Sequence, residues 1–553
     1  MIKMKNIITV VCAMLAMTSC IEDLSQYEYL QTNKVTFDSY LDHDYTWTSG
    51  DEVELVAPIT FSQPYENEAD IDKDFEINWY VNAELLNQGY RIKYIVDKIG
   101  AFSLALKVVN RTTGETYVSD IYRANAKSSF SWGWVVLSER EQEASSLSFI
   151  SPLGLFATHN LESNIPDGLG TGPKNIYHYY VLGSIPDVYI SGLSKVIVNQ
   201  KSGTVTLDGD SYQKDKWMRD EFASGTEPVA DFTMAGFAWK ETYYLIYTPE
   251  GDIYERTMSN SYSGIPYYST YSSTPMSFEG GAKIGCFNSF KNVSFNVPNE
   301  DVTLLYDELN SRFIAIDADG SGETYEEYRP KAIYLNFYDQ EGEFDPSVPK
   351  VNNLGAGTKC LGIGAYEYCG STESVAFDMY PKYVTLLDLG GSGNYQIYRF
   401  TVTPMNANNH MITENTMVPF SGSSILTKDS IVHMSTDFEK NPFFYFTDGN
   451  KKLYVYSMEA GAHALAYEAT SKITGMSSSS LACPFSSYGA NSTAANFRLA
   501  LTQEGGVVSV LDVAESNMVK LFEGQKPDLL LKSISGFGDI KDIEWVTNYE
   551  GEF

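Results

Sequence analysis

The feature that most constrains the fold of this chain is a short unit that recurs seven times after about residue 130. Each unit is an apolar run, a polar turn and a second apolar run, which predicts a β-hairpin because turn residues between two short apolar runs reverse the chain. The paired runs are residues 134–137 and 147–150, 196–198 and 204–207, 244–247 and 253–254, 304–306 and 313–316, 384–387 and 395–398, 443–446 and 453–456, and 499–501 and 507–510.

A single hairpin cannot bury both of its faces, so repeated hairpins must stack or close on one another. Closing them radially gives a β-propeller, which leaves only short, protected edges. The units recur about every 60 residues, longer than the roughly 40–50 residues of compact propeller repeats, and the excess is expected in loops. Two consecutive sandwich domains are the alternative. Recurrence of one unit favours a β-propeller of about seven blades over residues 129–553.

Residues 34–128 follow a different pattern of short predicted strands, with Trp79 as a candidate core residue. About 90 residues of this kind predict an immunoglobulin-like sandwich. Pro58 has no N–H for a sheet ladder, so the strand before it is expected either to end there or to lie at a sheet edge. The runs are residues 53–57, 75–81, 99–108 and 116–118. The chain is therefore predicted to be mostly β. Residues 214–222 are the best short helix candidate, expected on a loop between blades.

The first 20 residues predict export and lipidation. Two lysines precede an apolar run over residues 7–17, which falls short of the roughly 20 residues that span a bilayer and is typical of a signal peptide. The run leads into Thr18-Ser19-Cys20, which resembles a bacterial lipobox. We expect residues 1–19 to be removed and Cys20 to carry lipid. An ordinary signal peptide followed by a chance cysteine is the alternative.

Residues 20–33 are expected to form a tether between the lipid and the folded part. Glu22 and Asp23 follow the cysteine and resemble the surface-export signal of Bacteroidota lipoproteins, with a plain acidic tether as the alternative. The expected location is the outer membrane, with the folded part facing the cell exterior.

The charge of the chain argues against nucleic acid as a partner. The formal net charge is −32, whereas binding to a phosphate backbone needs clustered Lys and Arg to release counterions. The sequence contains 40 Tyr, a residue that suits both strands and binding surfaces. Most of these tyrosines are expected to fill strands.

The most unusual segment, residues 261–271, packs four Tyr among small polar residues. Tyr rings supply contact area at low entropic cost, and propeller ligands usually bind where loops converge at one end of the channel. We therefore expect Tyr267, Tyr268 and Tyr271 to be exposed on one propeller face and to contact a glycan or peptide. A loop that packs on its own propeller is the alternative.

Two further patterns involve metal binding and a disulfide. Asp317, Asp319 and Ser321, followed by Gly322, resemble the start of a calcium loop, but Tyr328 stands where a bidentate Glu is required. A solvated acidic turn is the favoured interpretation, so no metal is expected. Cys360 and Cys369 are nine positions apart and either staple a loop or hairpin or remain free buried thiols.

Motifs for catalysis are missing from the sequence. The six His are scattered, and the chain has no HExxH, GxSxG, Walker or GxGxxG pattern. No cofactor is expected, and the chain is interpreted as a binding protein and not an enzyme. A propeller-fold surface hydrolase such as a glycosidase, and a structural scaffold of a membrane complex, remain the alternatives.

Taken together, these features resemble the PKD-like family of Bacteroidota surface lipoproteins. The resemblance rests on Cys20, on residues 77–82 and 100–104 in the sandwich, and on residues 133–139 and 305–313 in the propeller part. It implies an accessory role beside a SusC/SusD-type importer, capturing glycan or peptide nutrients at the outer membrane.

Cys20→Ala is expected to abolish lipidation and leave the chain largely soluble or unprocessed, because the thiol is the site of acylation. Metabolic labelling with a fatty acid measures this directly. Uptake of label by the variant at the parental level would place the anchor elsewhere.

Overall fold

A computed structural model describes most of the chain after residue 31, in two compact units, Met1–Ala126 and Lys127–Phe553. The division lies beside the expected boundary at residues 128 and 129. Cys20 lies outside the described residues. Among the residues described, no helix is long and apolar enough to cross a membrane. The described residues are 32–40, 43–48, 52–96, 100–127, 130, 132–181, 193–223, 236–240, 243–248, 250–260, 266–268, 270–288, 303–318, 330–337, 347–369, 380–406, 409–434, 442–479 and 497–547.

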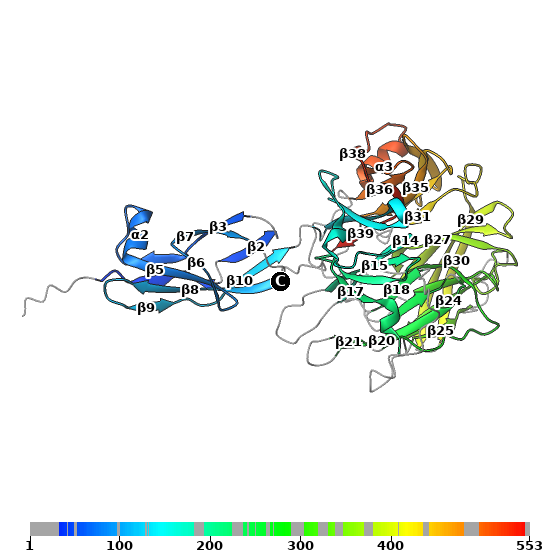
Figure 1. Cartoon of the computed structure of the whole chain (residues 1–553). Helices are drawn as coiled ribbons and strands as arrows, with labels where there is room; N and C mark the ends of the chain where they lie inside the picture. The colour runs from blue at the N-terminus through cyan, green and yellow to red at the C-terminus, as the bar shows by residue number, and fades with distance from the viewer. Residues whose placement is uncertain are drawn as a thin grey trace, which may run out of the picture. The chain divides into compact units, whose positions relative to one another are not determined.

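The first unit packs three small sheets around one core (Figure 1). Its largest sheet has the order β2-β10-β8-β5-β6, with β9 also paired to β8, and the two other sheets are β1-β4 and β3-β7. The strands are β1 (Val35–Phe37), β2 (Asp44–Thr48), β3 (Glu52–Val56), β4 (Ile59–Phe61), β5 (Phe75–Val81), β6 (Glu84–Gln88), β7 (Arg91–Ile95), β8 (Gly100–Asn110), β9 (Thr116–Val118) and β10 (Tyr122–Lys127).

Strand β5 shows why this core forms. Its side chains alternate, so that Phe75, Ile77 and Trp79 are fully buried, as a strand with a period of two requires. The Trp79 indole Nε1 donates a hydrogen bond to the Gly89 carbonyl at 3.1 Å. The prediction that Trp79 is a core residue is confirmed. A helix that the sequence analysis missed, α2 (Glu68–Asp74), begins after Asn67, whose side chain accepts a hydrogen bond from the Ala69 N–H.

The second unit consists of seven consecutive antiparallel sheets. Sheet one has the order β13 (Ala157–His159), β12 (Ser145–Ile150), β11 (Trp132–Glu139), β39 (Asp539–Thr547). Sheet two is β14 (Pro173–Val181), β15 (Leu193–Gln200), β16 (Val205–Asp208), β17 (Lys214–Trp217). Sheet three is β18 (Gly236–Lys240), β19 (Tyr243–Tyr247), β20 (Ile253–Asn260), β21 (Pro266–Tyr268). Sheet four is β22 (Ile284–Asn288), β23 (Thr303–Asp307), β24 (Arg312–Ala318), β25 (Pro330–Tyr334).

The remaining three sheets repeat this order. Sheet five is β27 (Lys359–Cys369), β28 (Tyr380–Leu389), β29 (Asn394–Asn406), β30 (Asn409–Pro419), with β26 (Asn336–Phe337) added parallel to β30. Sheet six is β31 (Val432–Met434), β32 (Phe443–Thr447), β33 (Lys452–Ser457), β34 (Ala462–Glu468). Sheet seven is β35 (Ile473–Ser478), β36 (Arg498–Gln503), β37 (Val507–Asp512), β38 (Leu530–Ser535). A short helix, α3 (Glu515–Phe522), follows β37.

All seven predicted hairpins are present, each as the middle pair of a sheet. The mostly β prediction is therefore confirmed. These middle strands carry apolar runs because both of their faces are buried against neighbouring sheets. In β11, for example, Val135 packs toward sheet two whereas Trp134 packs toward sheet seven. Comparable apolar clusters lie between sheets three and four, four and five, five and six, and six and seven.

Sheet one is assembled from strands far apart in sequence, because β39 pairs antiparallel with β11. Trp545 of β39 stacks edge-on against Trp134, with ring centroids 4.7 Å apart. The Trp134 indole in turn donates to the Ser477 carbonyl of sheet seven at 3.2 Å. The last described strand thereby joins the first and last sheets.

The edge strands on one side of the sheets contact one another in succession. Contacts join β39 to β14, β14 to β18, β18 to sheet four, β22 to β27, β27 to β31, and β35 to β39. The one remaining step, from β31 to β35, is made by His433 Nε2 and Ser478 Oγ at 2.9 Å. Of these strands, Figure 1 labels β14, β18, β27, β31, β35 and β39 toward the middle of the unit, and β17, β21, β25 and β38 lie toward its periphery. The seven sheets thus form a closed circuit of neighbours.

Mild proteolysis is expected to release a fragment of about 100 residues from the N-terminal side, since linkers between compact units are preferred cleavage sites. Cleavage is expected near Lys127, where the second unit begins. Mass spectrometry of a limited trypsin digest checks the cut site. Digestion of the first unit without such an intermediate would contradict the two-unit division.

Candidate functional site

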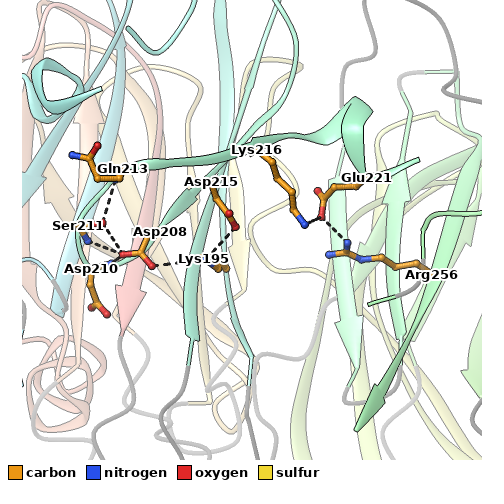
Figure 2. A network of polar contacts seen from close by, with 9 residues as sticks. All are labelled: Lys195, Asp208, Asp210, Ser211, Gln213, Asp215, Lys216, Glu221 and Arg256. Atoms are coloured by element: carbon orange, nitrogen blue, oxygen red, sulfur yellow. Dashed lines mark hydrogen bonds and ion pairs between the residues drawn. The ribbon is translucent and has the colours of Figure 1, made fainter. Parts of the chain in front are cut away.

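Charged side chains gather on the face of sheet two that is turned toward sheet three. The Lys195 ammonium lies 3.2 Å from a carboxylate oxygen of Asp215 and 3.8 Å from one of Asp208. These three residues come from strands β15, β16 and β17, which are neighbours in the sheet. We call them the Lys195 cluster (Figure 2).

A tight turn fixes the position of Asp208 at the end of β16. Its Oδ1 accepts hydrogen bonds from the Asp210 N–H at 3.2 Å, and from the Ser211 N–H and hydroxyl at 2.9 and 2.8 Å. Asp side chains favour such turns because they bond to the backbone two or three residues on. The other oxygen, Oδ2, is the one directed to Lys195.

A second group, the Glu221 cluster, comprises Lys216, Glu221, Arg256, Tyr244 and Tyr271. The Glu221 Oε1 accepts from Arg256 Nη1 at 2.6 Å and lies 3.0 Å from Lys216 Nζ. Figure 2 shows the two cations converging on this carboxylate from β17 and β20. Only 2% of the Glu221 side chain and 3% of the Arg256 side chain is exposed. The ion pair therefore lies inside the protein, between the two sheets.

Two tyrosine rings hold the Arg256 guanidinium. Its Cζ lies 4.8 Å from the centroid of Tyr244 and 4.6 Å from that of Tyr271, a geometry in which the cation is attracted to the ring faces. Tyr271 also stacks on Phe222, and its N–H donates to the Glu221 carbonyl at 3.0 Å. These contacts tie sheet two to the segment that follows β21.

The expectation that Tyr271 is exposed to ligand is wrong. Only 2% of this residue is accessible, and burial raises the pKa of its phenol. The physical reason is the buried Arg256, which needs an aromatic cover to compensate its lost hydration. For Tyr271, the alternative interpretation, a loop that packs against the rest of the second unit, is the correct one.

Tyr267 and Tyr268 lie in β21, where they pair with Ser259 and Met258 of β20. Strand β21 is the outer edge of sheet three, away from the strands that make the closed circuit. The side chains of both tyrosines lie outside the described residues, so their role in binding stays a prediction.

The weak calcium candidate begins inside a strand. Asp317 belongs to β24 and pairs with Lys331 of β25, whereas Asp319 and Ser321 lie outside the described residues. Within the described ranges, no group of three or more His, Cys, Asp or Glu is arranged to hold a metal ion.

A disulfide between Cys360 and Cys369 is ruled out by strand geometry. Both belong to the single strand β27, and nine steps of about 3.3 Å place their Cα atoms roughly 30 Å apart, whereas a disulfide needs about 4.4–6.8 Å. The Cys360 thiol is free and buried, so the free-thiol alternative is correct for this residue. The segment between the two cysteines is therefore neither a loop nor a hairpin but part of one continuous strand.

The two clusters differ in what they can do chemically. The buried Glu221–Arg256 pair is sealed, so it can stabilise the sheet interface but cannot touch a ligand, whereas Lys216 beside it is 39% exposed. The Lys195 cluster is open at its two carboxylates, since the Asp208 and Asp215 side chains are 37% and 40% exposed while the Lys195 side chain is 16% exposed. Its carboxylates accept hydrogen bonds and its ammonium donates them, which suits a polar ligand with hydroxyl or amide groups.

Neither cluster was predicted from the sequence. Residues 214–222 were expected to form a helix, whereas they contain strand β17 and a 3₁₀ turn over Met218–Glu221. The three consecutive charged residues Lys214, Asp215 and Lys216 show no apolar and polar alternation, so no periodic signal marks this strand. The partners Lys195 and Arg256 are distant in sequence, so no local pattern connects them to it.

Comparisons with known proteins name no family. No protein-family model matches the chain, and no curated protein matches it. Among solved structures, it is similar to a quinonprotein alcohol dehydrogenase-like protein from Bacteroides thetaiotaomicron, with a TM-score of 0.34 and 11% identity over 91% of this chain and 96% of that one. It is also similar to human WBSCR16 (TM-score 0.25, 10% identity, 69% and 89% covered). A DUF4784 family protein from Bacteroides caccae matches with a TM-score of 0.21 and 8% identity over 69% and 99% of the two chains.

Glu221→Ala is expected to lower the free energy of unfolding by about 3–5 kcal/mol, because it leaves the buried Arg256 charge without its partner. Urea unfolding of the purified chain measures the loss. The matched control is Glu143→Ala, since the Glu143 side chain is 58% exposed in its ion pair with Lys201 and such pairs contribute about 0–1 kcal/mol.

The Tyr271→Phe variant removes the hydroxyl and keeps the ring, so it tests the two groups separately. Among the described residues, the hydroxyl has no hydrogen-bond partner, so its removal is expected to leave stability unchanged or slightly raised. Tyr271→Ala is expected to cost about 3–5 kcal/mol, as for other buried aromatics. Equal losses for the Phe and Ala variants would contradict a role for the ring as the cover of Arg256.

Proposed function

We propose that this chain is a lipid-anchored protein of the outer membrane, facing the cell exterior, that binds a glycan or peptide as an accessory to a SusC/SusD-type importer. Cys20 after the apolar run supports the anchor, and the acidic residues that follow it support surface export. The resemblance to PKD-like surface lipoproteins supports the importer as partner. The open Lys195 cluster is the structural observation on which the binding role rests.

The proposed architecture is an immunoglobulin- or PKD-like sandwich over residues 34–128 followed by a seven-bladed propeller over residues 129–553. In support, seven antiparallel sheets follow one another, and their neighbouring edge strands make a closed circuit. The pairing of β39 with β11 supplies the closure that a ring of blades requires. Each four-stranded sheet is then one blade, with β14, β18, β22, β27, β31, β35 and β39 innermost.

This architecture sets the Lys195 cluster and β21 at one end of the ring. In a four-stranded antiparallel blade, the connections after the first and third strands emerge at the same end. Lys195 lies close to the start of β15, after the first connection, and Asp208 ends β16, before the third. Pro266 and Tyr267 begin β21 just after the corresponding third connection of the neighbouring blade. Propeller ligands usually bind at such an end, so these residues form the proposed binding surface.

The charge of the chain narrows the ligand class. A net charge of −32 repels polyanions. The two carboxylates of the Lys195 cluster can accept hydrogen bonds from a ligand, and its ammonium can donate them. A neutral oligosaccharide or a short peptide matches that pattern.

Lys195→Ala and Asp215→Asn are expected to weaken binding about tenfold or more, because a hydrogen bond from a charged group contributes roughly 1.5–3 kcal/mol. A panel of neutral oligosaccharides and short peptides identifies the ligand on the parent chain, and calorimetry compares the variants. Lys201→Ala is the matched control, since Lys201 follows β15 at the opposite end of the same sheet and its side chain is 72% exposed. Circular dichroism checks that each variant is folded.

Equal binding by all three variants would remove the Lys195 cluster from the proposed surface. Chromatography of the ligands after incubation tests the hydrolase alternative, because cleavage products would identify an enzyme. Co-purification with an outer-membrane importer in the absence of any ligand binding would instead favour a scaffold.

A further inference from the structure

Two free thiols from neighbouring sheets meet in the second unit. Cys286 lies in β22 of sheet four and Cys360 in β27 of sheet five, and these two strands contact each other. Cys286 packs against the apolar cluster that contains Cys360, and Cys286 adds to the effect of burial in raising the pKa of the Cys360 thiol. The Cys360 Sγ donates to the Gly362 carbonyl at 3.5 Å. Both thiols are free in the structure.

We propose that Cys286 and Cys360 are a redox pair that closes into a disulfide and covalently joins sheet four to sheet five. A disulfide bridges two cysteines whose side chains already face each other, with little backbone movement. The pair cannot be found from sequence spacing, because 73 residues separate Cys286 from Cys360. Cys369 is closer to Cys360 in sequence, but it lies at the far end of the same strand.

The two thiols differ in access, which gives them different roles. Cys286 is partly exposed, whereas Cys360 is buried. The attacking species in disulfide exchange is a thiolate that reaches the oxidant. Cys286 is therefore the entry thiol and Cys360 the resolving thiol.

The reaction consumes a small-molecule or protein disulfide as oxidant. The Cys286 thiolate attacks one sulfur of that disulfide, forms a mixed disulfide and releases the first thiolate. The Cys360 sulfur then attacks the Cys286 sulfur, forms the Cys286–Cys360 bond and releases the second thiol. Two electrons pass from the two cysteines to the oxidant, and their two protons end on the two released thiols.

The local environment slows the second step near neutral pH. Burial raises the pKa of the Cys360 thiol, and the neighbouring Cys286 and the Glu308 carboxylate raise it further. A raised pKa means less thiolate at pH 7 and more at pH 9, so closure is expected to accelerate as the pH rises.

Export would place the chain in an oxidising compartment, where disulfides are available as oxidants. The inference rests on the proposed function only for this supply of oxidant. The chemistry can be tested without export or ligand. The full chain, purified under reducing conditions, is equilibrated with a graded ratio of oxidised to reduced glutathione, trapped with an alkylating reagent and mapped by mass spectrometry. The expected product is a linked peptide that contains Cys286 and Cys360.

Three variants give the comparison. Cys286→Ala and Cys360→Ala are expected to lack the linked peptide, whereas Cys369→Ala, changed at the far end of β27, is expected to keep it. Oxidation of the parent is expected to raise its Tm by about 5 °C, because the bond closes a long loop in the unfolded chain, and reductant is expected to reverse the shift.

Two results would overturn the inference. One is that Cys286 and Cys360 both remain alkylated as free thiols on the folded parent in fully oxidised glutathione. The other is that either cysteine pairs with Cys369 or Cys483 instead. Failure of ligand binding in the earlier experiment would leave this result untouched, so the two proposals are separable.

Discussion

The pairing of β39 with β11 is the constraint on which the second unit depends. Without it, sheet one would lack its inner strand and sheet seven would lose the neighbour that covers it. The pairing is anchored by apolar contact as well as by the backbone ladder, because Trp134 and Trp545 meet edge-on and both bond to Ser477 of sheet seven. Two large aromatic side chains therefore stabilise the meeting of the first and last sheets, where an error in register would expose an entire strand face.

Apolar contact joins most neighbouring sheets, but sheets two and three also bury charge. The Glu221–Arg256 pair gains its Coulomb attraction only after losing hydration, so its geometry must be good for it to be tolerated. The flanking rings of Tyr244 and Tyr271 and the second cation, Lys216, compensate part of that loss, whereas the Glu221 Oε2 has no hydrogen-bond partner among the described residues. Such a pair admits few alternative arrangements, which favours one fixed approach of the two sheets. The Lys195 cluster lies on the same face of sheet two, so its position relative to sheet three is fixed by the same contacts.

The sequence predicted the seven hairpins because their strands are buried on both faces and therefore carry apolar runs. The outer strands escaped detection for the opposite reason. Strand β17, with the sequence Lys214-Asp215-Lys216-Trp217, begins with three charged residues and is only four residues long, too short for periodicity to distinguish strand from helix. Its Asp215 and Lys216 contact Lys195 of β15 and Glu221 through the packing of strands and sheets, which no local pattern encodes. The Tyr271 prediction failed because composition cannot tell a ring that covers a buried cation from one that awaits a ligand.

The distance in sequence between β11 and β39 has a consequence for the order of events during synthesis. A chain made from its N-terminus produces β11 about 400 residues before its partner exists, and such long-range pairings form slowly because the intervening chain must first be ordered. The first unit has no such dependence, since its core is drawn from residues within Val35–Ala126. The two units therefore differ in timing: one can fold while the chain is still growing, whereas the other completes sheet one only after β39 has emerged. Until then, the free edge of β11 is open to wrong partners.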